Sequence, residues 1–101
     1  MNSPSGYFYH YKHDPAGPLN NYAYEAFGLA RHSEDKSVFV MYRPLYKNSY
    51  FEGVDASVRP YDMFMENVTK DGVEIPRFTK ITDEAVIAEL QAIRDRMYPQ
   101  S

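Results

Sequence analysis

The chain has 101 residues, a formal net charge of −3 and no cysteine. This length allows one domain with one core, and the acidic balance disfavours non-specific nucleic-acid binding, which relies on basic side chains at phosphates. The absence of cysteine excludes disulfides, thiolate metal ligands and a cysteine nucleophile. We see no secretory leader and no apolar run near the roughly 20 residues that cross a bilayer, so we expect a cytoplasmic protein without membrane attachment.

The N-terminal part is rich in aromatic residues and predicts two strands. Residues 1–5 look like a flexible tail, and segment 6–13 lacks helical spacing, which favours a strand. Side chains alternate along a strand, so one face should carry Tyr7, Tyr9 and Tyr11, and the other Phe8, His10 and Lys12. Two prolines and a glycine within 14–18 end this strand. A second strand is expected over 22–30, with a bulge or a close backbone approach at Gly28.

The middle of the chain contains its most apolar segment. A polar turn at 33–37 leads into 38–42, which is apolar at every position and predicts a central strand covered on both faces. The polar segment 47–55 predicts the longest loop, in which Tyr50 and Phe51 either fold back onto the core or await a partner.

A short strand, a helical turn and a hairpin are expected next. Residues 56–59 form the strand, and the proline that follows suits the first position of a helical turn over 60–64. Segments 64–69 and 73–78 should then pair as a hairpin, because Asp71-Gly72 between them is a strong turn signal.

The C-terminal segment predicts one amphipathic helix over about 83–97. Its apolar side chains recur at helical spacing, at Val86, Leu90, Ile93 and Met97. Either Thr82 or Asp83 can cap its first turn. Because a lone helix of about 15 residues is marginal in water, we expect it to cover the outer face of strand 38–42.

Five segments, in order, resemble a known family. They are Tyr24–Glu34, Val40–Tyr46, Val58–Pro60, Met63–Phe64 and Asp71–Phe78. Over about Tyr9 to Phe78 the chain closely resembles the small bacterial proteins called domain of unknown function 1653. The resemblance implies a compact SH3-like β-barrel and no established activity, substrate or catalytic residue. Ser57 stands where the family commonly shows tryptophan, so a ligand site lined by that tryptophan would have a different shape here.

The strand pattern agrees with this implied fold. We expect a mainly β protein in which residues 6–98 form a single domain. That domain would be a five-stranded SH3-like barrel with the helix of about 83–97 packed on it.

Arginines stand where apolar runs meet turns, at Arg31, Arg43, Arg59 and Arg77. Strand ends meet at the edge of a small β domain, where guanidinium groups can bind an anion in a bidentate manner. The alternative is structural, in which these arginines pair with carboxylates such as Glu25, Glu34, Asp62 or Glu66.

The leading functional hypothesis is a non-enzymatic recognition module without metal or cofactor. It would bind an anionic small molecule, nucleotide or peptide through Arg31, His32, Tyr42, Arg43, Tyr46 and Arg59. Most other tyrosines are expected to fill the core. Two histidines, His10 and His13, would lie on opposite faces of a strand, which argues against a metal site.

Two alternatives stay open at this stage. One is a hydrolase or transferase acting on a phosphorylated substrate, with His32 as base, Glu34 orienting it and the arginines holding the phosphate. The simpler interpretation of that segment is a turn in which Ser33 and Glu34 bond the local backbone. The other alternative is a structural adaptor that dimerises through a strand edge or the helix, so a monomer and a homodimer are both expected states.

Overall fold

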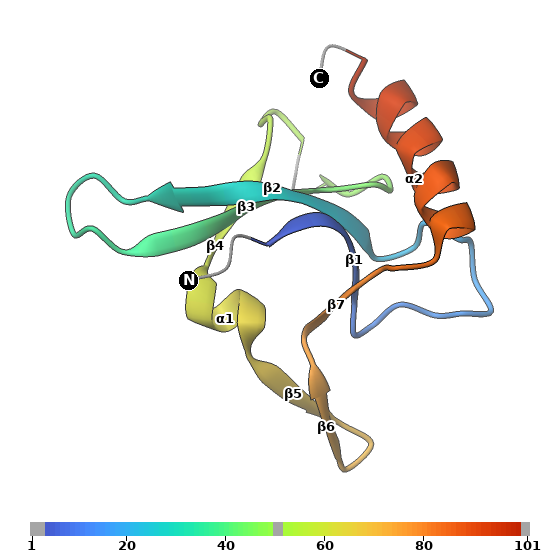
Figure 1. Ribbon diagram of the computed structural model, residues 1–101, viewed down its shortest axis with the longest axis horizontal. Coiled ribbons are helices and arrows are strands. Elements are labelled where there is room, and N and C mark those ends of the chain that lie inside the picture. The colour runs from blue at the N-terminus through green and yellow to red at the C-terminus, as the bar shows by residue number, and fades with distance from the viewer. Residues whose placement is uncertain (1–3, 50–51, 100–101) are drawn as a thin grey trace.

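The structure is a computed structural model that describes residues 4–49 and 52–99 (Figure 1). Its described elements are β1 (Ser5–His10), β2 (Ala23–Arg31), β3 (Val38–Pro44), β4 (Ser57–Pro60), α1 (Tyr61–Met65), β5 (Asn67–Lys70), β6 (Val73–Pro76), β7 (Phe78–Lys80) and α2 (Glu84–Met97). The protein is therefore mainly β with a C-terminal helix, as expected. Strand β1 begins at Ser5, inside the segment expected to be a tail. Residues 1–3, and the Tyr50 and Phe51 of the long loop, lie outside the described residues.

An antiparallel sheet positions most of these elements. Its strand order is β4-β3-β2-β1-β7, and β5 pairs only with β6 in a separate hairpin. Since β4 and β7 are the two ends of this order, the sheets are not closed into a barrel in the part of the chain that the structure describes. The expected five-stranded SH3-like barrel is therefore not confirmed.

The last predicted strand is divided in two in the structure. Segment 73–78 was expected to be one strand. In the structure β6 ends at Pro76 and β7 begins at Phe78. Proline has no N–H to donate to a ladder, and the Arg77 N–H instead donates to the carbonyl of Glu66 at 3.0 Å. The chain thus changes direction, so β7 pairs with β1 while the β5–β6 hairpin projects away from the sheet (Figure 1).

Two local features predicted from glycine are confirmed. The β2–β3 register shifts between Ala26 and Gly28, and Gly28 has a φ of 145°, which is a β-bulge. Asp71 and Gly72 have φ values of 52° and 78°. Positive φ at both central residues is typical of a type I′ hairpin turn, so the β5–β6 turn has the predicted geometry.

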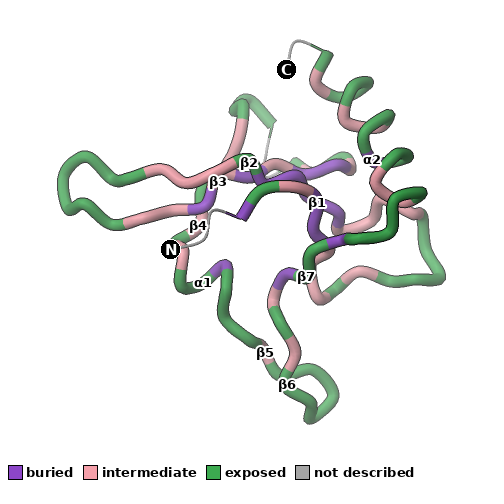
Figure 2. The backbone as a smooth tube through the Cα atoms, viewed as in Figure 1, coloured by how far each residue is buried: buried purple, intermediate pink, exposed green. Residues whose placement is uncertain are grey.

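Each face of the sheet carries its own hydrophobic cluster. One face holds Phe8, Tyr24, Ala26, Val40, Tyr42, Phe64 and Phe78. The other holds Tyr7, Ala23, Leu45, Ile81 and Leu90. Figure 2 shows the buried positions concentrated along the central strands. The expected alternation along β1 is confirmed, because neighbouring aromatic residues enter opposite clusters.

Helix α2 begins as predicted but packs elsewhere. Asp83 caps it, since its carboxylate accepts the N–H groups of Ala85 and Val86. Its buried Leu90 joins the cluster of Tyr7 and Leu45. The helix therefore covers β1, the start of β2 and the segment after β3, whereas Val40 and Tyr42 of the strand it was expected to cover face the opposite cluster.

Among the helices that the structure describes, neither α1 nor α2 is long and apolar enough to cross a bilayer. The cytoplasmic location stays a prediction.

Candidate functional site

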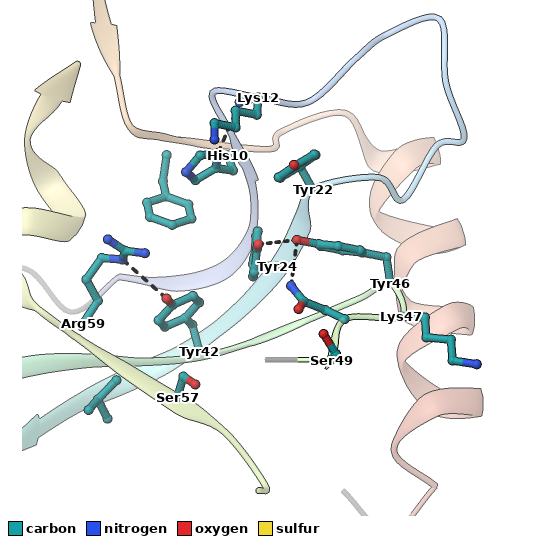
Figure 3. A pocket seen from close by; sticks show the side chains of 13 residues that line it. His10, Lys12, Tyr22, Tyr24, Tyr42, Tyr46, Lys47, Ser49, Ser57 and Arg59 are labelled. Carbon is teal, nitrogen blue, oxygen red and sulfur yellow. Dashed lines mark hydrogen bonds between the residues drawn. The ribbon is translucent and has the colours of Figure 1, made fainter. Parts of the chain in front are cut away.

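An open pocket of about 780 Å³ lies on the sheet face that α1 partly covers (Figure 3). Rings contribute much of its lining, from His10, Tyr22, Tyr24, Tyr42, Tyr46 and Phe78. The cationic side chains at the pocket are Lys12, Lys47 and Arg59. Uncharged residues complete it, namely Asn48, Ser49, Ser57 and Val58.

Tyr24 of β2 forms the centre of the pocket floor. Its ring centroid lies 5.5 Å from those of Tyr42 and Tyr46 and 5.7 Å from that of Phe78. These rings come from β3 with the segment after it and from β7, so together with β2 the floor joins three parts of the chain that are distant in sequence. Burial raises the pKa of the Tyr24 hydroxyl above its ordinary value, and this group stays protonated at neutral pH.

Hydrogen bonds fix the orientation of the tyrosine rings. The hydroxyls of Tyr24 and Tyr46 are 2.5 Å apart, and Asn48 Nδ2 donates to the Tyr46 hydroxyl at 3.2 Å. At the other side of the floor, Arg59 Nε donates to the Tyr42 hydroxyl at 3.4 Å. The Arg59 guanidinium also lies 5.7 Å from the Phe78 ring centroid, a cation–π distance. Both ends of the pocket are therefore ordered by contacts between its own side chains.

The pocket is basic although the chain as a whole is acidic. Its described lining includes three cationic side chains and no carboxylate, whereas the chain carries a formal charge of −3. Burial, followed by the nearby charges of Arg59, Arg77 and Lys12, lowers the pKa of His10 from 6.5 to about 4. His10 is therefore neutral near pH 7, and its Nδ1 accepts the Lys12 backbone N–H at 3.2 Å. The ring proton then belongs on Nε2.

The lowered pKa of His10 predicts a pH-dependent stability. Between about pH 6.5 and 4 the unfolded chain binds a proton at His10 that the folded protein does not, so the free energy of unfolding should decrease as pH falls through this range. The imidazole is only half-buried, and after solvent screening we expect a loss of about 1 to 2 kcal/mol. Urea unfolding at about pH 7.5 and about pH 5 measures it. His10→Gln should lose this component, and an unchanged pH dependence in that variant would contradict the prediction.

Three of the sequence-predicted residues lie together at the pocket. They are Tyr42, Tyr46 and Arg59. Arg43 does not join them, because consecutive strand residues point to opposite faces. Its Nε donates to Glu25 at 2.9 Å, and its guanidinium lies 4.0 Å from the Tyr98 ring centroid. Arg43 is therefore a structural tie between the sheet and the C-terminal segment.

Arg31 and His32 also lie away from this pocket. The long β2–β3 hairpin carries them to its exposed turn (Figure 1), where Arg31 Nη1 donates to the Lys36 carbonyl at 2.9 Å. His32 Nδ1 accepts the backbone N–H groups of Glu34 and Asp35 at 3.1 and 3.4 Å. The segment is therefore a local turn, but the side chains that accept its backbone N–H groups are His32 and Asp35 rather than the expected Ser33 and Glu34. Neither His32 nor Glu34 lines this pocket.

The fourth arginine is paired as well. Arg77 Nη2 donates to Glu66 Oε1 at 2.6 Å. The expectation that distant arginines gather at one pocket is therefore wrong, since only Arg59 lines it among those described.

Several pocket residues were missed by the sequence prediction. They include His10, Lys12, Tyr22, Tyr24 and Lys47. The alternation expected along β1 places His10 and Lys12 on the same face of the strand. This pattern would have identified both residues if that face had been assigned to a ligand site. No such pattern identifies Tyr22, because the position of its side chain depends on a backbone φ of 52° at this residue, just before β2.

Within residues 4–49 and 52–99, no three His, Asp or Glu side chains gather in a way that could hold a metal ion. His13 stacks on Tyr9 with ring centroids 3.6 Å apart, and its Nδ1 lies 2.7 Å from the Asn21 carbonyl oxygen.

Comparisons with known proteins agree with the resemblance seen in the sequence. No curated protein matches the chain. A crystal structure of a family protein from Bordetella bronchiseptica is 32% identical, with a TM-score of 0.61, covering 77% of this chain and 86% of that one. The family described as protein of unknown function (DUF1653) matches residues 6–80, which include every described strand element from β2 to β7 and most of β1. The chain belongs to the DUF1653 family.

Proposed function

We propose that this protein is a non-enzymatic recognition module that binds an anionic small molecule, nucleotide or peptide group in the pocket around Tyr24. The observation that carries this proposal is the segregation of charge, since the described lining residues include Lys12 and Arg59, with Lys47 at the edge, and no carboxylate, in an otherwise acidic protein. A cavity lined by charges of one sign attracts ligands of the opposite sign.

The lining chemistry supports an anion in particular. Arg59 offers a planar set of N–H donors that suits carboxylate or phosphate, and Lys12 adds a second positive charge. The aromatic floor lowers the local dielectric, which strengthens the attraction between an anion and these cations. The pocket size also falls within the range of small-molecule sites.

Binding is favoured over catalysis by the state of His10. An efficient general base has a pKa near the working pH, whereas the pKa of His10 is lowered to about 4. Its Nδ1 also accepts the Lys12 N–H. His10 is therefore a neutral donor in this pocket.

A paired charge-removal experiment tests the proposal. Pyrophosphate and citrate serve as probe anions in isothermal titration calorimetry at low ionic strength. The variant K12A/R59Q should weaken binding at least tenfold, because each charge-assisted hydrogen bond contributes about 1.5 to 3 kcal/mol. Added salt should also weaken binding to the wild-type protein.

The control is R31Q/K36A, which removes an equal amount of positive charge from the exposed β2–β3 turn. It should bind the probe anions within about twofold of the wild type. Equal losses in the two variants, or no detectable binding of either probe to the wild-type protein, would overturn the proposal.

A further inference from the structure

The two ends of the pocket differ in chemistry. Figure 3 places His10, Lys12 and Arg59 around one end, with Phe78 among the rings that line the pocket. The charges of Arg59 and Lys12 both lower the pKa of His10, which agrees with this grouping. This end therefore offers two cations and a neutral ring N–H.

The opposite end is aromatic and polar. The Tyr22 and Tyr46 ring centroids are 5.6 Å apart, and Asn48 Nδ2 donates to the Tyr46 hydroxyl. Ser49 also lines the pocket (Figure 3). In the same view the amine of Lys47 is directed away from these rings. This end is suited to a flat group that stacks on a ring and forms hydrogen bonds at its edge.

An aromatic wall connects the two ends. His10 stacks near Tyr22 with ring centroids 5.6 Å apart, and Tyr22 in turn lies beside Tyr46. Tyr22 and Tyr46 are half-buried, so each leaves part of its ring accessible from the pocket. A ligand could therefore contact the cationic end and a ring face at the same time.

We propose that the ligand is a nucleoside monophosphate, with its phosphate at His10, Lys12 and Arg59 and its base against Tyr22 and Tyr46. This inference rests on the proposed function and specifies its ligand class. Two cations and one neutral donor match a dianionic tetrahedral group better than a single planar carboxylate. Any of the bases can stack on aromatic side chains, because every base has a flat π face. Amide and hydroxyl groups can form hydrogen bonds to the edge of the base.

A ligand-dissection experiment tests this assignment. Calorimetry compares the four ribonucleoside monophosphates with ribose 5-phosphate, inorganic phosphate and the free nucleosides, all at low ionic strength. The best monophosphate should bind at least tenfold more tightly than ribose 5-phosphate and than its own nucleoside, because stacking and the phosphate each contribute about a factor of ten or more.

Variants separate the two ends. Tyr22→Leu should weaken monophosphate binding several-fold, toward the affinity of ribose 5-phosphate, while leaving ribose 5-phosphate binding unchanged. K12A/R59Q should weaken both ligands. Phe27→Leu, which removes an exposed ring outside the pocket, should change neither.

Each outcome decides the assignment. If monophosphates and ribose 5-phosphate bind equally, or if free nucleosides bind as tightly as monophosphates, the nucleotide assignment is wrong. Binding of pyrophosphate and citrate with that result would leave the general anion proposal intact. Failure of every anion would overturn both.

Discussion

Replacing Phe64 with alanine is expected to lower the free energy of unfolding by about 3 to 5 kcal/mol. Phe64 is 1% exposed and stacks on Phe78 with ring centroids 4.2 Å apart. It also meets the edges of Phe8 and Tyr42 at 5.4 and 5.9 Å. Removing this ring leaves a cavity under the pocket floor that neighbouring rings cannot close without moving. A domain of this size has only about 5 to 15 kcal/mol of stability, so the loss is severe.

Urea unfolding followed by far-ultraviolet circular dichroism measures the loss. The matched control is Phe27→Ala, because Phe27 is 43% exposed and should cost below about 1 kcal/mol. If the two phenylalanine variants were equally stable, α1 would not be the element that completes this side of the core. Phe64→Leu should retain much of the stability lost in Phe64→Ala.

Replacing Glu25 with glutamine should be the most damaging change to the charged network. Each oxygen of this nearly buried carboxylate binds a different arginine, Arg43 at 2.9 Å and Arg94 at 3.1 Å. Hydrogen bonding to Glu25 is also the main reason that the pKa of Arg94 is raised. Breaking a fully buried pair costs about 3 to 5 kcal/mol. Because Arg94 is partly exposed, we expect about 2 to 3 kcal/mol.

The control for Glu25→Gln uses the second partner of the same arginine. Asp95 lies 2.9 Å from Arg94 and is 68% exposed, so Asp95→Asn should cost below about 1 kcal/mol. Chemical denaturation of both variants gives the comparison. Amide hydrogen exchange in α2 should increase in Glu25→Gln, because this carboxylate links the helix to the sheet. Similar stabilities for Glu25→Gln and Asp95→Asn would show that the network contributes little.

Local sequence signals predicted local structure well. The Asp71-Gly72 turn, the Gly28 bulge and the Asp83 cap each depend on residues a few positions apart. Such features follow from backbone sterics and short-range hydrogen bonds. They could be assigned without knowing what the elements pack against.

The candidate site was predicted only in part because similar motifs can face opposite ways. Arg43 and Arg59 both precede proline, yet Arg59 lines the pocket and Arg43 pairs with Glu25 on the other face. Which face a residue takes depends on strand register and on the element that covers that face. Neither is visible in a dipeptide motif.

By itself, the sequence determined the mainly β character, the family, the hairpin turn and the amphipathic C-terminal helix, since period, propensity and turn chemistry are encoded locally. Tertiary structure alone decided that the sheet stays open, that α2 packs on Tyr7 and Leu45, and that His10, Tyr24 and Arg59 share one basic pocket. These features require contacts between residues far apart in the chain. Such contacts are selected by burial and pairing across the whole fold, and no short segment specifies them.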